Sequence, residues 1–370
     1  MSEASQQVHE LLRKARGDSD GDVSLLQEAT RIADTHGDVA LGMLARVKLI
    51  SAANFSGNHE LVLVAFTWCL AQIDRDEQLR LHWERDVFWY YKWVIDSLSE
   101  YTQVPRSQLE RSFADMTQRF TRAGYGPDAI QQCRAHTSMR LGDVDQFNDA
   151  FNRWLTTPRD GISDCPACQT DALAEFELFR GNLEAAVAVA EPIIRGDQSC
   201  AEVPCVTFGR LAMPLLKLGL REVAANMCRR TIRQALSSRD LIGTLGQQSL
   251  YLELIGKPTR AIQVFETGMS WLPLVRRSWD RMRFLDGTAL MFERLAAKDD
   301  TPIKLKIPPA ISFHREDHAY KPSQVAQQLE MMRAQLAAEF NRRNGNDYMD
   351  QRHQQFRELV ASITTIPGGE

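Results

Sequence analysis

The sequence predicts an all-α fold built from stacked helical hairpins. Between proline and glycine breaks, apolar residues recur at helical spacing over most of the 370 residues. Alternating β-branched runs, which are typical of strands, are nearly absent. In the middle of the chain, glycines mark turns at an almost constant interval. The hydrophobic fraction of 44% is enough for a well-packed core, and the charged fraction of 25% is ordinary for a soluble protein.

The first hundred residues are expected to form consecutive helices. In the first of them, Leu26, Ala29 and Ala33 share one apolar face. A break at Ser56-Gly57 separates two of the helices, and Pro105 is placed to begin another, because proline is tolerated in a first turn. The expected helices span 23–36, 39–54, 60–73 and 77–101.

Aromatic residues are concentrated between Trp83 and Trp93. Aromatics at consecutive positions cannot all face one side of a helix, so a helix buried between two neighbours is one interpretation. The other is that Trp89 and Trp93, which are four residues apart, line a groove for an apolar side chain of a partner.

A repeat is visible in the glycines at positions 142, 181, 219 and 256, which are 37 to 39 residues apart. This period is typical of solenoids of helical pairs. The residues five positions after each glycine are Phe147, Ala186, Ala224 and Ala261, and those nine positions after are Phe151, Ala190, Cys228 and Phe265. We expect these residues to pack between paired helices or against the next pair.

The stretch from Leu252 to Pro273 resembles the tetratricopeptide repeat (TPR), with Gly256, Ala261, Phe265 and Gly268 at that family's offsets. The resemblance covers roughly residues 20 to 295. The family's first-helix tryptophan and its Leu-Gly pair are missing from most units. The sequence therefore predicts either a TPR-like fold or another kind of α-solenoid. The resemblance implies a TPR-like right-handed superhelix whose concave face holds a peptide or a partner's helix. In this alignment the first-helix positions that face inward include Gln132, His136, Asp171 and Glu175.

Two cysteine pairs accompany the repeat: Cys165 with Cys168, and Cys200 with Cys205. Cys168 precedes Gly181 by thirteen residues and Cys205 precedes Gly219 by fourteen, so both fall at the start of a repeat's first helix. In a solenoid such helices are neighbours, about 10 Å apart. We therefore expect four thiols to converge, and four sulfurs are the ligands of a structural zinc site.

Other interpretations of these cysteines stay open. One is that they are ordinary buried or loop cysteines. Another is that Cys165 and Cys168 form a redox-active disulfide. The Cys200–Cys205 spacing is wide for a ligand pair. Cys69, Cys133 and Cys228 lie on apolar helix faces and are expected to fill the core.

The net charge of −4 gives no general attraction to nucleic acid or membrane. Residues 210–283 nevertheless carry thirteen Lys and Arg against five Asp and Glu, a local excess of eight positive charges. Such residues usually decorate solvated helix faces, but they would also suit an acidic protein or nucleic acid. No aromatic-interleaved RNA-binding motif or helix-turn-helix accompanies them. The basic-patch candidates are Arg229, Arg230, Arg233, Arg276 and Arg277.

The C-terminal part changes character. Residues 299–321 are punctuated by prolines and predict an extended linker, with 303–307 alternating like a short edge strand. Residues 322–370 predict a helical hairpin that caps the repeat domain of residues 1–298 or docks on a partner, with Ser323 as N-cap and the turn at Gly345. The segment Phe340–Asp347 resembles the tail of some bacterial TPR-like proteins that also carry paired cysteines and have no assigned activity.

Motifs for phosphate-loop, dinucleotide-binding, metalloprotease and serine-hydrolase chemistry are absent. We therefore expect no enzyme but a scaffold, adaptor or regulator that binds a protein or peptide and contains structural zinc. The rivals are a zinc- or thiol-dependent enzyme using the cysteines, and a nucleic-acid-binding regulator using the arginines. No apolar run is long enough to span a membrane, residues 1–16 contain no signal-peptide core, and seven cysteines suit a reducing cytoplasm.

Overall fold

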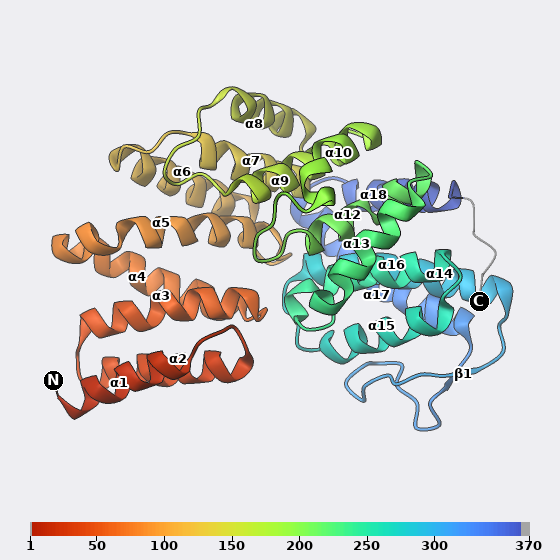
Figure 1. The fold of residues 1–370 in the computed structure, drawn as a ribbon, viewed down its shortest axis with the longest axis horizontal. Coiled ribbons are helices and arrows are strands. Elements are labelled where there is room, and N and C mark those ends of the chain that lie inside the picture. Colours follow the sequence, from red (N-terminus) through yellow and green to blue (C-terminus); the bar gives the residue numbers. More distant parts are fainter. Residues whose placement is uncertain (1, 364–370) are drawn as a thin grey trace. The chain divides into compact units, whose positions relative to one another are not determined.

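The computed structural model describes residues 2–363, and in these residues almost all regular structure is helical (Figure 1). The predicted all-α class is confirmed. The described residues divide into two compact units. Unit 1 comprises residues 2–98, 109–133 and 156–163, and unit 2 comprises residues 99–108, 134–155 and 164–363.

Unit 1 is built from consecutive helices in which α1 packs on α2, α2 on α3 and α3 on α4. A capping box between Ser19 and Asp22 begins α2, whose buried face includes Leu26, Ala29 and Ala33 as predicted. The helices are α1 (Glu3–Lys14), α2 (Asp20–Thr35), α3 (Val39–Phe55), α4 (His59–Arg75), most of α5 (Glu77–Ser99), most of α6 (Arg106–Arg122) and the start of α7 (Asp128–Leu141).

The aromatic stretch lies on α5 and is largely internal to unit 1. Phe88 is buried and stacks on Phe120 with a centroid distance of 5.1 Å. The half-buried Trp93 contacts the edge of Phe55 at 5.5 Å, and the ammonium of Lys92 lies 3.5 Å from the centre of the Trp89 ring. These contacts fit the interpretation of a helix packed between neighbours, and a groove at the two tryptophans stays a prediction.

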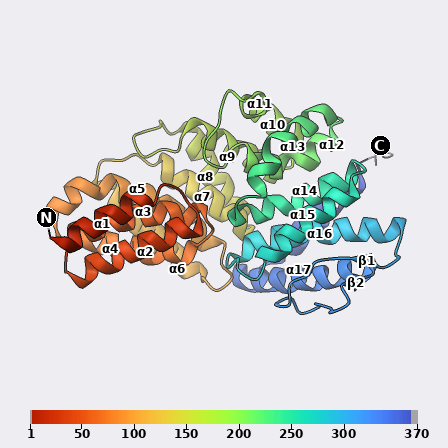
Figure 2. The same cartoon turned by 60° about the horizontal axis from the view of Figure 1, so that its bottom comes forward.

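Unit 2 contains the repeated hairpins. Helix α9 packs on α10, α12 on α13 and α14 on α15, while α12 contacts both α9 and α14, and α14 contacts α16 (Figure 2). The elements are α8 (Val144–Thr156), α9 (Pro166–Phe179), α10 (Leu183–Val189), α11 (Glu191–Arg195), α12 (Cys205–Lys217), α13 (Arg221–Ala235), the 3-10 helix η1 (Arg239–Leu241), α14 (Ile242–Leu254), α15 (Pro258–Trp271), α16 (Ser278–Lys298), β1 (Ile303–Lys304), β2 (Ala319–Tyr320), α17 (Pro322–Asn344) and α18 (Tyr348–Ala361).

The four turn glycines of the repeat all have a left-handed backbone, with φ between +69° and +81°. Only glycine adopts this conformation without strain, and it ends one helix so that the next can fold back. The residues five positions later are all fully buried, and those nine positions later are at most 7% exposed. The predicted repeat period is therefore confirmed as recurring local structure.

The first helices of the later hairpins approach each other through glycine. A Cβ atom added to Gly287 of α16 would lie 2.3 Å from the carbonyl oxygen of Gly246 on α14. A Cβ atom on Gly246 would lie 2.6 Å from the backbone of Phe284. The backbones of α14 and α16 are thus in contact, and no side chain fits between them.

The C-terminal segments belong to unit 2. Strands β1 and β2 pair antiparallel, with Ile303 opposite Tyr320, so the strand is shorter than expected. Leu305 and Ile307 are buried in the unit 2 core, and α17 packs along α16. The division into a repeat domain that ends at residue 298, a linker of residues 299–321 and a C-terminal hairpin stays a prediction.

The expected N-cap of α17 is wrong. Lys321 is the capping residue, while the N–H and hydroxyl of Ser323 donate to the Asp300 carboxylate at 2.8 and 2.7 Å. The turn is as predicted, because Gly345 ends α17 with φ +74°. Among the described helices, none combines the length and the apolar character that crossing a membrane requires.

We expect Gly287→Ala to destabilise the protein, because the added methyl group must force two helix backbones apart. Overpacking of this kind costs about 1–3 kcal/mol. Gly161→Ala is the matched control, since nothing lies within 4 Å of its Cβ position and its free energy of unfolding should change by less than about 0.5 kcal/mol. Urea unfolding followed by circular dichroism measures both, and equal stability of the two variants would contradict the packing described here.

Candidate metal centre

Three of the four predicted cysteines come together in unit 2. The Sγ atoms of Cys165, Cys168 and Cys200 all lie within 4.8 Å of one another. Cys165 and Cys168 belong to the start of α9, and Cys200 lies in the loop between α11 and α12. The loop and the helix start are 32 residues apart in the chain, from Cys168 to Cys200, so their meeting is a tertiary feature.

The start of α9 positions two of the sulfurs. Cys165 is the N-cap residue with an extended backbone, and Pro166 occupies the first helical position, where its fixed φ and missing N–H suit the helix. The Cys168 N–H points back and donates to the Cys165 sulfur at 3.4 Å. The Cys-Pro-Ala-Cys sequence therefore forms its own cap, with both sulfurs on the same turn.

Local packing holds the loop of Cys200 against this helix start. Val203 in the loop forms a small apolar cluster with Ala167 of α9 and Ile193 of α11. The Cys200 N–H donates to the Val203 carbonyl at 3.1 Å, which closes the turn that carries the sulfur. The side-chain amide of Gln234 donates to the backbone of the same loop at 2.6 Å.

The three thiols are not electrostatically equivalent. Burial acts to raise the pKa of Cys165, but the Cys168 N–H and the thiols of Cys168 and Cys200 outweigh it, so this pKa lies below its ordinary value. Burial, together with the neighbouring Cys165, raises the pKa of Cys168 far above the usual range, and burial also raises the pKa of Cys200. Of the three thiols, Cys165 is therefore the one that loses its proton most readily in the metal-free cluster.

The geometry fits a thiolate-bound metal. Four sulfurs around a tetrahedral zinc ion at about 2.3 Å are separated by about 3.8 Å. Sulfurs within 4.8 Å need to contract by no more than about 1 Å, and Cys200 is exposed, so an ion can reach them. Among the described residues, no other Cys, His, Asp or Glu joins the group, so this part of the chain supplies three ligands.

The prediction that Cys205 is the fourth ligand is wrong. Its side chain is fully buried and its thiol donates to the Thr231 carbonyl at 3.7 Å, while burial raises its pKa to about 12. Helix α12 does begin at Cys205, as the repeat predicts, but Cys168 is the third residue of α9. Counted from the turn glycines, Cys168 and Cys205 differ by one position, and because each residue turns a helix by about 100°, their side chains point in different directions. Cys69, Cys133 and Cys228 are buried as predicted.

The groove candidates separate into two groups. Gln132 is buried and belongs to unit 1. In unit 2, Asp171 and Glu175 of α9 flank Arg210 of α12, whose guanidinium lies 2.6 and 2.9 Å from their carboxylates. His136 Nε2 lies 3.7 Å from Glu175. No sequence pattern predicted a role for Arg210. The repeat nevertheless places it on α12, the first helix of the hairpin that follows the two acids of α9.

Burial controls the protonation of this network. It lowers the pKa of His136 to about 3, so the imidazole is neutral at pH 7. Burial acts to raise the pKa of Glu175, but Arg210 and His136 outweigh it and hold this pKa at about 2. The pKa of Asp171 is raised by burial in spite of Arg210, while Thr207 donates to its carboxylate at 2.7 Å.

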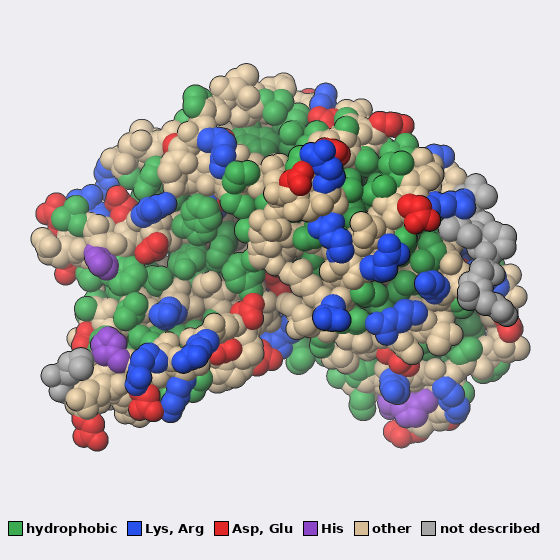
Figure 3. Space-filling model, in the orientation of Figure 1, with side chains coloured by type: hydrophobic (Ala, Val, Ile, Leu, Met, Phe, Trp, Pro, Cys, Tyr) green, Lys and Arg blue, Asp and Glu red, His purple; other side chains and the backbone are tan. Residues whose placement is uncertain are grey.

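The arginine candidates do not all face solvent. Arg229, Arg233 and Arg276 are exposed, and Arg230 donates to the Ile194 carbonyl at 2.6 Å. The prediction for Arg277 as part of a basic patch is wrong, because its half-buried guanidinium forms ion pairs with three carboxylates of unit 2. Lys and Arg side chains are visible over the helices of unit 2, interspersed with apolar ones (Figure 3). The partners of Arg277 are Glu100 at 2.9 Å and Asp240 and Asp280, each at 2.6 Å.

No protein-family model matches the chain, and no curated protein matches it either.

In the metal-free protein, we expect Cys165 to react with iodoacetamide at lower pH than Cys200 does. The thiolate is the reactive form, and the pKa of Cys165 is lowered whereas that of Cys200 is raised, so the Cys165 rate rises first as the pH increases. Peptide mapping by mass spectrometry across pH 6–9 measures the rates. Cys205 serves as the buried control and should react only after unfolding, so its early labelling in the native protein would contradict its assigned position.

Proposed function

We propose that this chain is a non-catalytic, TPR-like helical-repeat protein that binds a protein or peptide, and that a structural zinc ion at Cys165, Cys168 and Cys200 joins two of its hairpins. The single observation that carries the proposal is the meeting of these sulfurs across consecutive hairpins with equivalent turns.

The solenoid part of the proposal is supported by the recurring hairpin. Equivalent glycine turns and equivalent buried positions recur in α7–α8, α9–α10, α12–α13 and α14–α15. The neighbouring first helices α12, α14 and α16 pack on one another. Repetition of one contact between similar hairpins generates a superhelix, and in this class the inner surface is the binding surface.

Zinc is the metal that suits the donors best. Thiolates select soft or borderline ions, and zinc is the usual metal of tetrahedral sites rich in cysteine. The Cys165 thiolate and the positive end of the α9 dipole favour the charged form that binds the ion. The ion would tie the loop of residues 196–204 to α9. All seven cysteines are free, which suits a reducing compartment such as the cytoplasm.

A specific feature favours a second candidate. With three protein ligands in the described residues, a tetrahedral zinc ion keeps one position for an outside ligand. A zinc ion with an exchangeable position is the arrangement of catalytic sites, so a zinc-dependent enzyme is the alternative function. Cobalt substitution discriminates between the two: a visible spectrum that shifts on addition of small thiols or cyanide supports an open position, and an unchanged spectrum supports a closed structural site.

We expect purified protein to contain about one zinc ion per chain by inductively coupled plasma mass spectrometry. Cys165→Ser and Cys168→Ser should each lose most of the metal, because two sulfurs hold zinc weakly. Cys205→Ser is the matched control and should retain it, since that thiol contacts Thr231 instead. Loss of metal in all three variants, or sub-stoichiometric zinc in the unmodified protein, would refute the three-sulfur assignment.

For the binding function, we expect selection from a random peptide display library to enrich ligands that occupy the first-helix face of unit 2. Hydrogen–deuterium exchange with a selected peptide should show protection on α9 and α12, where the Arg210 network lies, and little change on α13 and α15. The absence of any enriched peptide, or protection confined to α13 and α15, would count against a groove on the first helices.

A further inference from the structure

Unit 2 contains a cavity of about 790 Å³ that the metal centre does not use. Its lining comes from the first helices α7, α9, α12, α14 and α16, from the starts of α8 and α10, and from one side of the last helix α18. The volume falls in the range of small-molecule sites, about 300–1,000 Å³. The cavity is therefore large enough for an organic ligand.

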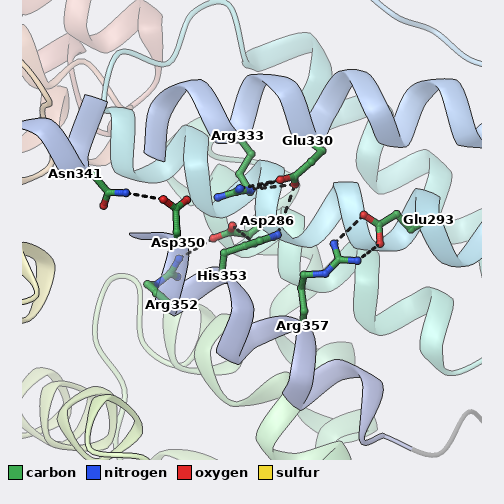
Figure 4. A network of polar contacts seen from close by, with 9 residues as sticks. All are labelled: Asp286, Glu293, Glu330, Arg333, Asn341, Asp350, Arg352, His353 and Arg357. Atoms are coloured by element: carbon green, nitrogen blue, oxygen red, sulfur yellow. Dashed lines mark hydrogen bonds and ion pairs between the residues drawn. The ribbon is translucent and has the colours of Figure 1, made fainter. Parts of the chain in front are cut away.

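The wall formed by α18 is held in place by ion pairs (Figure 4). Asp286 of α16 accepts from Arg352 at 2.7 Å and contacts His353 Nδ1 at 3.1 Å. One turn later, Arg357 forms two bonds of 2.8 and 2.7 Å with Glu293. Burial acts to raise the pKa of Asp286, but Arg352 and His353 outweigh it and keep the carboxylate ionised. The cavity is thus largely formed before a ligand arrives.

Most of the wall is apolar. Side chains from seven helices contribute hydrocarbon or aromatic surface to the lining, and Leu178, Phe179, Phe356 and Leu359 are only half-buried. Half-buried apolar side chains that surround a cavity gain free energy when a ligand covers them. The walls therefore suit a ligand with an apolar body.

The arginines of the lining form ion pairs at contact distance, except one. Arg210 pairs with Asp171 and Glu175, Arg352 pairs with Asp286, and Arg180 pairs with Glu177. Among the described residues, the guanidinium of Arg283 on α16 has no carboxylate partner.

Arg283 is also held in position and partly desolvated. Its stem packs against Gly243 of α14, whose added Cβ atom would lie 3.2 Å from the Arg283 Cβ. Burial and the nearby Arg210 lower the pKa of Arg283, and the longer-range attraction of Glu175 and Asp280 only partly offsets them. A partly buried charge without a partner is unfavourable, and an anion placed beside it would relieve the cost and form charge-assisted hydrogen bonds.

We propose that this cavity binds a small amphiphilic carboxylate, with the carboxylate on the Arg283 guanidinium and the apolar body against α9, α12 and α18. One carboxylate is specified because one lining cation lacks a partner. An apolar body is specified because the half-buried wall residues are hydrocarbon and aromatic. The inference goes beyond the proposed function, since it assigns a small-molecule ligand that neither the metal centre nor a bound peptide requires.

The test compares decanoate with 1-decanol by isothermal titration calorimetry, at concentrations below micelle formation. The two probes share the chain and differ in the charge. We expect decanoate to bind with 1:1 stoichiometry and at least about tenfold more tightly than decanol, because the guanidinium favours an anion. Arg283→Gln should abolish this difference and leave decanol binding unchanged. Arg276→Gln, at an exposed arginine outside the cavity, is the matched control and should behave as the unmodified protein.

A second variant tests the place of binding. Leu359→Trp on α18 should fill the cavity and weaken both probes, whereas Leu274→Trp, at a residue that is 55% exposed and lies outside the lining, should weaken neither. Circular dichroism establishes that each variant is folded. Equal affinity of acid and alcohol, unchanged decanoate binding in Arg283→Gln, or no binding of decanoate to the unmodified protein would each overturn the proposal. The display-selected peptides, measured in parallel, report on the proposed function separately.

Discussion

The structure of unit 2 depends on a tight turn whose glycine lies in the left-handed region. At 142, 181, 219 and 256 this turn ends a first helix and reverses the chain, so that the residue five positions later is carried into the core. Because the reversal recurs at a nearly constant spacing, equivalent helices become neighbours. The contact between Gly246 and Gly287 shows how close such neighbours come. The sulfur cluster and the cavity both lie on helices that this arrangement brings together.

Charged groups between these helices form ion pairs that cross from one hairpin to another. Arg210 joins two carboxylates of α9, and Arg277 joins Glu100, Asp240 and Asp280. Removing one partner from such a network leaves a charge without compensation, which is more costly than the net contribution of the intact pair. These networks therefore specify which helices can meet, and Arg283 is notable because it stands among them without a carboxylate of its own.

In unit 2, the proposed metal site and the proposed ligand site would depend on different interactions. At the cysteines, the N–H groups of a helix start stabilise a thiolate, and the ion would add a bond between segments distant in the chain. In the cavity, apolar walls and one cation without an ion pair would select the ligand. The first site is at the surface, with Cys200 exposed, while the second is a hollow between helices with α18 as one wall.

Periodicity alone determined the helical class, the hairpin turns and the buried positions after each glycine, because these depend on local spacing and on the left-handed conformation that glycine permits. Spacing also identified Cys165, Cys168 and Cys200, since their helix start and loop recur with the repeat. Tertiary structure decided what spacing cannot encode: the burial of the Cys205 thiol against Thr231, the acids that enclose Arg277, and the wall that α18 forms. Each of these depends on the direction in which a side chain points once helices distant in the sequence have packed.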